Sequence, residues 1–264
     1  MQRVLFYVKA FVAFCLFLFS SCGLETYYYL EEPKANNNPN ISSADKTTNY
    51  FTLQTNETGN GDYINNNGEF SFLGTEVYYK IYKYKSRMSS VESTISARNE
   101  SSDITSAASY LSEHYSKLIC YENGKKSGTI LDPLLPPEGN GVNRYVYIRL
   151  NSYQNLVSAI KISDSIRNSC TEEERDYIPC RDIGGKTYGF DFSTDDSQRY
   201  ENPVPVEGDS DVDYTGTASD DEEETDWYVD LYAVSSGRDT SYSMSYSKVV
   251  HLGAVRISTE DYSN

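Results

Sequence analysis

The acidic stretch 207–226 holds the residues whose spacing comes nearest to a metal-binding motif. Asp209, Asp211 and Asp213 alternate, and Asp220 follows eleven residues after the first of them. Carboxylate oxygens at positions one, three, five and twelve are typical of a calcium loop, which also needs glycine at position six. Tyr214 occupies that position here. We therefore interpret the segment as a solvated acidic loop that binds cations weakly, with a dedicated calcium site as the less favoured alternative and no other cofactor expected.

Cysteine is the second residue type that could do chemistry. Cys170 and Cys180 flank the polar segment TEEERDYIP, which is short enough to close into a loop, so we predict a disulfide between them. Cys120 is left without a predicted disulfide partner. It lies at the apolar end of an expected helix, and we expect it to be a buried thiol rather than a nucleophile.

Tyrosine is unusually frequent, with 25 copies, and in the expected strands it takes the face opposite the aliphatic residues. Cross-strand aromatic pairing on a half-exposed sheet is the interpretation we favour. The alternative is a rigid aromatic contact surface for a protein or a glycan, because tyrosine offers much contact area and loses little rotamer freedom. The candidates for such a binding face are Tyr78, Tyr82, Tyr145, Tyr147, Tyr228 and Tyr232.

Motifs of known catalytic sites do not occur in the chain. It contains no G-x-S-x-G, no HExxH and no paired CxxC, and only two histidines, His114 and His251. Gly184-Gly185-Lys186-Thr187 imitates the end of a phosphate-binding loop, but YGFDF follows it where a helix should begin, so we predict a turn. We predict no catalytic residues and no enzyme. A carbohydrate-active enzyme built on paired carboxylates is the weakest alternative.

The first 22 residues indicate export. Arg3 precedes a ten-residue apolar run, 10–19, and Ser20-Ser21-Cys22 follows it. A short apolar run that ends at small residues is typical of a cleaved signal peptide and is too short to span a bilayer. We predict a signal peptide at 1–21. Phe19, Ser20 and Ser21 before Cys22 resemble the relaxed lipobox of spirochaetal lipoproteins, although Phe19 replaces the commoner Leu. The resemblance implies that Cys22 is the lipid-modified first residue of the mature chain; a plain cleaved signal is the alternative.

The charge of the chain limits its partners. The formal net charge is −16, and removal of Arg3 and Lys9 with the signal makes the mature chain more negative by two. Nucleic acids and anionic lipid surfaces are bound by clusters of Lys and Arg. We therefore predict no nucleic-acid partner, and contact with the membrane through the lipid anchor alone.

Period-two patterns dominate the mature chain and predict a mainly β protein. In the last segment Trp227, Val229, Leu231 and Ala233 share one face, and Tyr228, Asp230 and Tyr232 share the other. We expect one antiparallel β-sandwich of immunoglobulin or fibronectin style over 50–264, with 22–49 as a tether or an edge strand that Pro33 ends. A lipid-facing barrel would need more and longer strands.

One amphipathic helix is expected at about 102–122, where apolar residues recur at three and four residues. The preceding stretch 86–102 fits a helix or a loop. The acidic stretch 207–226 is expected to be a long solvated loop between two strands, because it carries ten acids and almost no apolar residue. The helical stripe comprises Ile104, Ala107, Ala108, Leu111, Tyr115, Leu118 and Ile119.

Three segments carry a resemblance to a known family: CGLETYYYLEEP, GTEVYYKIY and WYVDLYAVSSGRDTSYSMSYSKVVHLGAVRI. They resemble the lipoproteins of uncharacterised role that treponeme-type spirochaetes carry in many copies. The resemblance implies an exported protein anchored by lipid at the outer membrane, on the cell surface or the periplasmic face, and it implies no catalytic residues. We expect a binding or adhesion module for a host or envelope protein or glycan. A periplasmic structural or envelope-assembly protein is the alternative.

Overall fold

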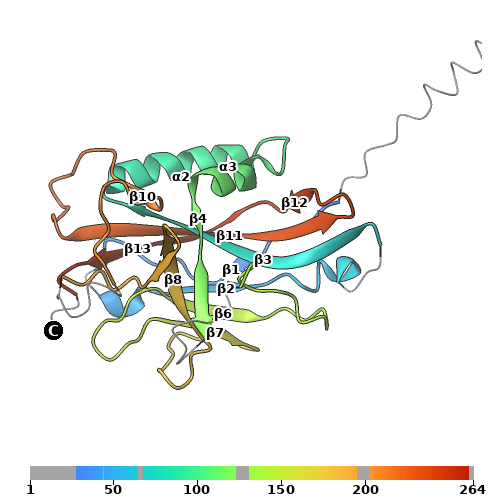
Figure 1. The fold of residues 1–264 in the computed structure, drawn as a ribbon, viewed down its shortest axis with the longest axis horizontal. Helices are drawn as coiled ribbons and strands as arrows, with labels where there is room; N and C mark the ends of the chain where they lie inside the picture. Colours follow the sequence, from blue (N-terminus) through green and yellow to red (C-terminus); the bar gives the residue numbers. More distant parts are fainter. Residues whose placement is uncertain (1–27, 44, 65–67, 123–130, 195–201, 262–264) are drawn as a thin grey trace, which may run out of the picture.

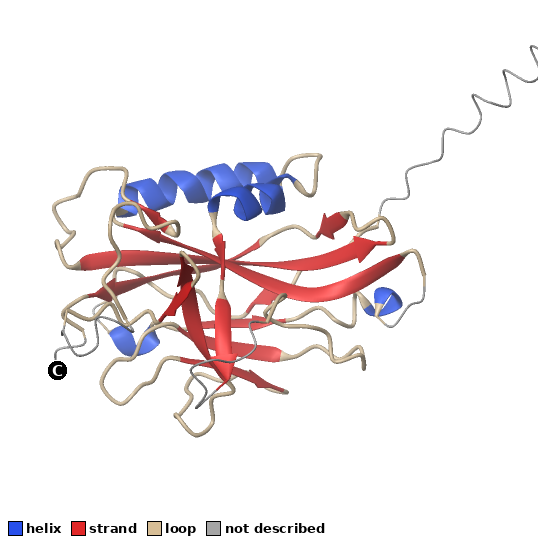
Figure 2. Ribbon diagram, in the orientation of Figure 1, coloured by secondary structure: helices blue, strands red, loops and turns tan. Residues whose placement is uncertain are grey.

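The computed structural model describes residues 28–43, 45–64, 68–122, 131–194 and 202–261, and shows two β-sheets packed face to face (Figures 1 and 2). The first sheet has the order β1-β2-β6-β7-β8-β5, with β9 paired to β8. Its strands pair antiparallel throughout. They are β1 (Lys34–Ala35), β2 (Phe51–Gln54), β5 (Ile119–Glu122), β6 (Tyr145–Arg149), β7 (Ala159–Ser163), β8 (Tyr177–Ile183) and β9 (Lys186–Tyr188).

The second sheet is built on its two longest strands, β3 (Phe70–Tyr82) and β11 (Asp226–Asp239), which pair antiparallel along most of their length. β13 (Val250–Ser258) and β12 (Met244–Tyr246) pair with β11, and β4 (Ser116–Lys117) pairs with β3. β10 (Val212–Asp213) adds a short parallel partner to β3. Two short 3-10 helices, η1 (Lys46–Thr48) and η2 (Gly61–Tyr63), lie in loops of the chain before β3.

The main core lies between the two sheets. The core includes alternate residues of β11, as their alternation predicts: Trp227, Val229, Leu231 and Ala233. From the first sheet it includes Val146 and Ile148 of β6, and Leu150 directly after that strand. Burial of such side chains contributes roughly 1.5–3 kcal/mol each, so this inner core supplies most of the drive to form the sandwich. The predicted fold class, a mainly β sandwich with an inserted helical segment, is confirmed.

Two helices, α2 (Lys85–Asn99) and α3 (Ser106–His114), cover the outer face of the second sheet (Figure 1). A second core lies beneath them, where Met88, Val91 and Ile95 of α2 and Leu111 of α3 pack on tyrosines of β3 and β11. The molecule therefore has three layers, which are helices, sheet and sheet. None of the helices in the described residues is long and apolar enough to cross a membrane.

The single helix expected at about 102–122 is wrong in its extent. The stretch that fitted either helix or loop forms α2, and the expected helix ends at His114. From Tyr115 the chain extends, and Leu118 N–H donates to the Val77 carbonyl at 2.7 Å. Leu118 and Cys120 enter the core between the sheets, while Leu111 packs in the core under the helices. The apolar spacing that suggests one helix thus serves two different cores.

The acidic stretch 207–226 is only partly the solvated loop that its composition predicts. Asp211 is completely buried, β10 joins the sheet, and Asp226 begins β11. Residues 214–221 are exposed throughout. Ion pairs with arginine, described below, order the first part of the stretch, and composition alone does not reveal these partners.

The N-terminal segment docks on the body, but its edge strand comes later than expected. Tyr28 stacks on Phe70 with ring centroids 4.3 Å apart, and Leu30 is fully buried against Phe70 and Phe72. The strand β1 begins directly after Pro33, where we expected the strand to end, and it pairs with β2. The predicted signal peptide and Cys22 lie outside the described residues.

Candidate functional site

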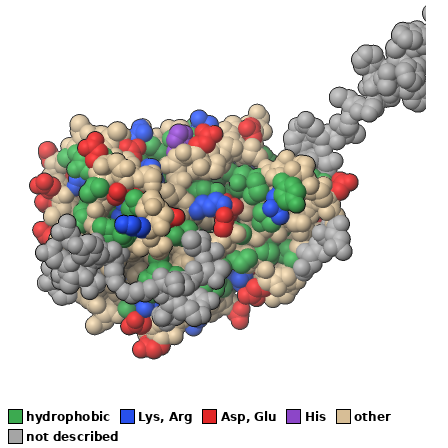
Figure 3. Space-filling model, in the orientation of Figure 1, with side chains coloured by type: hydrophobic (Ala, Val, Ile, Leu, Met, Phe, Trp, Pro, Cys, Tyr) green, Lys and Arg blue, Asp and Glu red, His purple; other side chains and the backbone are tan. Residues whose placement is uncertain are grey.

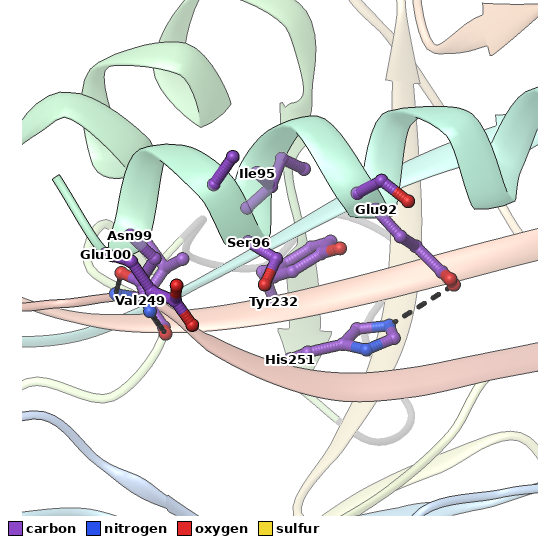
Figure 4. Close-up of a pocket in the computed structure, with 10 residues that line it drawn as sticks. Glu92, Ile95, Ser96, Asn99, Glu100, Tyr232, Val249 and His251 are labelled. Carbon is purple, nitrogen blue, oxygen red and sulfur yellow. Dashed lines mark hydrogen bonds and ion pairs between the residues drawn. The ribbon is translucent and has the colours of Figure 1, made fainter.

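A groove of about 580 Å³ opens between α2 and the second sheet (Figure 4). Ser93 and Ser96 of α2, with Glu100 directly after the helix, form one wall, and Tyr232 and His251 form the floor. Asn99 closes one end of it by exchanging two hydrogen bonds with the Val249 backbone, at 3.0 Å and 2.9 Å. The groove also takes in Glu92, Ile95, Ala97 and Val249.

Three titratable side chains from distant parts of the chain meet at the groove. His251 Nε2 lies 2.7 Å from Asp230 Oδ1 and 3.7 Å from Glu92 Oε1. One ligand-capable atom from each of the three lies within 4.8 Å of the others. Figure 4 shows the Glu92 and His251 side chains turned toward each other across the space between α2 and β13. We call Glu92, Asp230 and His251 the groove cluster.

A β-bulge in β13 brings His251 to this face. The pairing of β11 with β13 is regular up to Leu231 and Gly253, and then Tyr232 pairs with His251, so Leu252 is left over. Leu252 consequently points into the inner core and His251 points to the helix side. Gly253 has φ +105°, and a Cβ there would clash with the Asn38 side-chain oxygen, so the bulge requires glycine.

Hydroxyl groups hold the buried carboxylate of the cluster in place. Tyr115 donates to Asp230 Oδ2 at 3.0 Å, and the Tyr115 and Tyr82 hydroxyls lie 2.8 Å apart. Tyr232 stacks on the His251 ring, with centroids 4.7 Å apart and planes 23° from parallel. Both side chains that face Glu92 are therefore fixed by contacts within the helix-covered core.

Burial and mutual charge shift the titration of all three groups. Burial raises the pKa of Glu92, and the neighbouring Asp230 charge raises it further. Burial also raises the pKa of Asp230, which the His251 hydrogen bond opposes in part. Burial alone would lower the pKa of His251, but the hydrogen bond and charge of Asp230, together with Glu92, outweigh it and raise that pKa. The cluster thus favours positive charge between its two carboxylates, either on the imidazole or on a bound cation.

The six tyrosines considered as a binding face do not form one. Tyr78, Tyr82, Tyr228 and Tyr232 are at most 3% exposed, since α2 and α3 cover them. Tyr147 is buried in the other sheet against Ala159 and Cys170, and Tyr145 on the same strand is partly exposed. The alternative of an aromatic contact surface therefore does not hold, because strand periodicity shows that two faces differ but does not show what covers the second face.

The four aspartates of the calcium-like spacing diverge. Asp211 accepts two hydrogen bonds from the Arg181 guanidinium, at 2.8 Å and 2.9 Å, and Asp209 accepts a third at 3.1 Å. Asp213 instead accepts from Arg87 Nε at 2.8 Å. Asp220 lies in the exposed part of the stretch. Arg181 and Arg87 therefore pair with three of the four carboxylates, and the ligand set of the alternative calcium site is not brought together.

The predicted disulfide between Cys170 and Cys180 does not form, since both are free and buried. Cys170 packs with Tyr147 and Ala159. Cys180 lies in β8 beside β5, whose Cys120 is one register step away. Burial raises the pKa of Cys120 to about 12, which fits the inert buried thiol that we expected, although on a strand rather than at a helix end.

The groove cluster is the site that sequence reasoning missed. Two signals were available in the sequence. Asp230 is a carboxylate in mid-strand on the same face as Tyr228 and Tyr232, and Leu252 and Val255 are three residues apart where a regular strand would place them two or four apart. Neither signal identifies Glu92 as the third member, because α2 is brought over the sheet only in the folded chain. The chain matches no protein-family model, no curated protein and no solved structure.

Proposed function

We propose that the chain is an exported, lipid-anchored binding protein of the cell envelope, without catalytic activity, whose ligand occupies the groove under α2. One observation carries this proposal: Glu92 of α2, Tyr232 of β11 and His251 of β13 converge on the groove, and the buried Asp230 contacts His251 from behind. Ligand sites are concave and contain a few polar groups that converge from different elements.

The composition of the cluster supports a functional reading. Asp230 is a fully buried carboxylate on β11, at a position beneath the helices where an apolar side chain could also pack. Replacement of a buried ion pair by packed apolar residues is often neutral or stabilising, so such a pair is weak evidence of a role in stability. A role in recognition explains why a buried carboxylate supports His251, whose ring opens to the groove.

The N-terminal segment supports attachment close to a membrane. Cys22 precedes the docked Tyr28 by six residues, a length that spans at most roughly 20 Å. Lipid on Cys22 would therefore hold the body beside the bilayer rather than on a long tether. On the face that Figure 3 shows, acidic and basic side chains are interspersed, which suits a polar partner better than an anionic surface.

Binding in the groove is tested with a pair of helix variants. Ser96→Arg places a long side chain in the groove, whereas Ser90→Arg places the same side chain on an exposed position of α2 that does not line it. Wild-type protein and both variants are screened against arrays of glycans and of envelope and host matrix proteins. We expect saturable binding that Ser96→Arg abolishes and Ser90→Arg retains. Binding that both variants retain, or no binding at all, contradicts the proposal.

Anchoring and location are tested in cells. Labelled palmitate should enter the wild-type protein but not Cys22→Ser. Proteinase K added to intact cells should cut a surface protein in the exposed residues 214–221, while a periplasmic control protein survives. If the band survives in intact cells and disappears after lysis, the periplasmic envelope-assembly alternative takes the place of adhesion.

A further inference from the structure

We propose that Glu92, Asp230 and His251 bind a divalent transition-metal ion of the zinc class at the floor of the groove. The inference deepens the proposed function and rests on it in one respect, which is that the ion would become part of the groove's ligand site. It does not depend on lipid modification or export.

The donor atoms suit one such ion. Zinc is bound by imidazole nitrogen and carboxylate oxygen at about 2.0–2.2 Å, so two ligands of one tetrahedral ion lie roughly 3.3 Å apart. His251 Nε2 is 3.7 Å from Glu92 Oε1 and 2.7 Å from Asp230 Oδ1, and the three donor atoms all lie within 4.8 Å of one another. Only small movements are needed. Glu92 can approach because it is a long, partly exposed side chain of α2, and the His251–Asp230 pair has to open by roughly 0.6 Å to admit the ion.

The groups behind the ligands are those that metal sites use to orient them. Tyr115 donates a hydrogen bond to Asp230, and Tyr232 stacks on the His251 ring. Such outer contacts fix the ligand geometry before the ion arrives. The bulge at Gly253 is what turns His251 toward Asp230, so the backbone itself departs from regular pairing at the site.

The position of the cluster leaves one side of the ion accessible. Asp230 is completely buried, while the His251 side chain is 36% exposed and opens to the groove. Three protein ligands with an open fourth position characterise sites where an ion also binds an exogenous group. An oxygen or nitrogen atom of a groove ligand would take that position.

The donor set favours zinc over calcium or magnesium. Those two ions take oxygen ligands, whereas imidazole is a ligand of zinc and its neighbours in the transition series. The competing explanation is an imidazolium ion held between two carboxylates without any metal. The same three residues would serve both states, so the test must separate them.

Metal binding is measured on the full chain after treatment with a chelator, with Zn²⁺ alone as the probe, by calorimetry in competition with a chelator of known affinity. We expect one equivalent to bind at the cluster. Glu92→Gln should weaken binding at least about 10-fold and His251→Gln at least about 100-fold, since loss of even outer-shell partners weakens metal sites 10- to 100-fold. Circular dichroism verifies that both variants are folded.

The chain offers a matched control in its other Glu–His pair. Glu113 and His114 lie 3.9 Å apart on the exposed end of α3, outside the groove. Glu113→Gln and His114→Gln should leave zinc affinity unchanged. X-ray absorption of the loaded protein should show a single imidazole and otherwise oxygen neighbours.

Three results would overturn the metal site: no stoichiometric zinc binding, binding that Glu92→Gln and His251→Gln do not change, or sulfur neighbours, which would place the ion on cysteine. Each would favour the imidazolium ion pair at the cluster. The groove proposal has its own readout, because Ser96→Arg blocks the groove without removing a metal ligand. Zinc binding can therefore fail while groove binding persists, and the reverse can also occur.

Discussion

Two aspartates, Asp211 and Asp230, are both completely buried, yet their surroundings differ. Asp211 faces Arg181, which is itself buried. The Asp211 carboxylate accepts two hydrogen bonds from the Arg181 guanidinium and a third from the Tyr79 hydroxyl at 2.8 Å. Asp230 faces His251, whose side chain is about one third exposed and opens to the groove. The first carboxylate is enclosed on all sides by its partners, and the second has a partner that reaches solvent.

The difference separates a structural charge from a functional one. A guanidinium stays protonated at every ordinary pH and satisfies a carboxylate with two parallel bonds, so the Arg181–Asp211 pair joins β8 of the first sheet to the segment directly before β10 of the second. An imidazole can be charged, neutral or bound to a metal, and it exchanges with what enters the groove. Burial alone therefore does not identify a site; the identity and exposure of the partner do.

The largest expected effect is that of Asp211→Ala. The substitution leaves Arg181 charged, buried and without its main partner, and breaking a buried pair in this way costs about 3–5 kcal/mol of unfolding free energy. Urea denaturation followed by tyrosine fluorescence measures the loss. Asp220→Ala, an exposed acid of the same stretch, should change stability by less than about 0.5 kcal/mol.

Asp230→Ala should lower the unfolding free energy by less, about 1–3 kcal/mol. The Tyr115 hydroxyl loses its acceptor, but His251 can become neutral and be hydrated from the groove. The same denaturation experiment gives the comparison directly. A loss equal to that of Asp211→Ala would remove the distinction between an enclosed and an open carboxylate.

The hydroxyl donors give a finer test. Tyr115→Phe removes the donor to Asp230 and also the partner of the Tyr82 hydroxyl, so we expect a loss of about 1–2 kcal/mol. Tyr79→Phe removes one donor to Asp211, which keeps both bonds from Arg181, and we expect about 0.5–1 kcal/mol. A larger loss for Tyr79→Phe than for Tyr115→Phe would reverse the ranking.

The smallest effect concerns Asp213, two residues from Asp211 but only partly buried. Burial would raise its pKa, but hydrogen bonds from Thr215 and Arg87 outweigh burial and lower the pKa below the ordinary value of 3.8. A carboxylate with a lowered pKa stabilises the fold fully above pH 3.8, and that contribution is lost as the pH falls through 3.8 to the folded-state value. Asp213→Asn should therefore cost at most about 1 kcal/mol at pH 7.

The pH dependence is the check on this last effect. Unfolding free energies of wild type and Asp213→Asn should converge as the pH falls below 3.8. Asp220→Asn, on the exposed part of the same stretch, should change the unfolding free energy by less than about 0.5 kcal/mol at pH 7. A gap for Asp213→Asn that widens toward low pH would mean that Asp213 is not stabilised in its charged form.

The sandwich could be predicted from the sequence because strand periodicity is local. The alternation of Trp227, Val229 and Leu231 with tyrosines predicts which side chains enter the inner core, and each of the three does so. The helix at about 102–122 failed for a different reason. Leu111 and Leu118 fit one helical stripe, yet they pack in two separate cores on opposite sides of the second sheet.

The sequence by itself determined the strand-rich class, the two unlike faces of β11 and the acidic character of the chain. The tertiary structure decided that helices cover the tyrosine face, that Arg181 binds Asp211, and that Glu92 meets Asp230 and His251. The physical reason is the range of the interactions. Alternation follows from neighbouring residues, whereas a buried ion pair or a groove forms only when segments distant in the chain exclude water together.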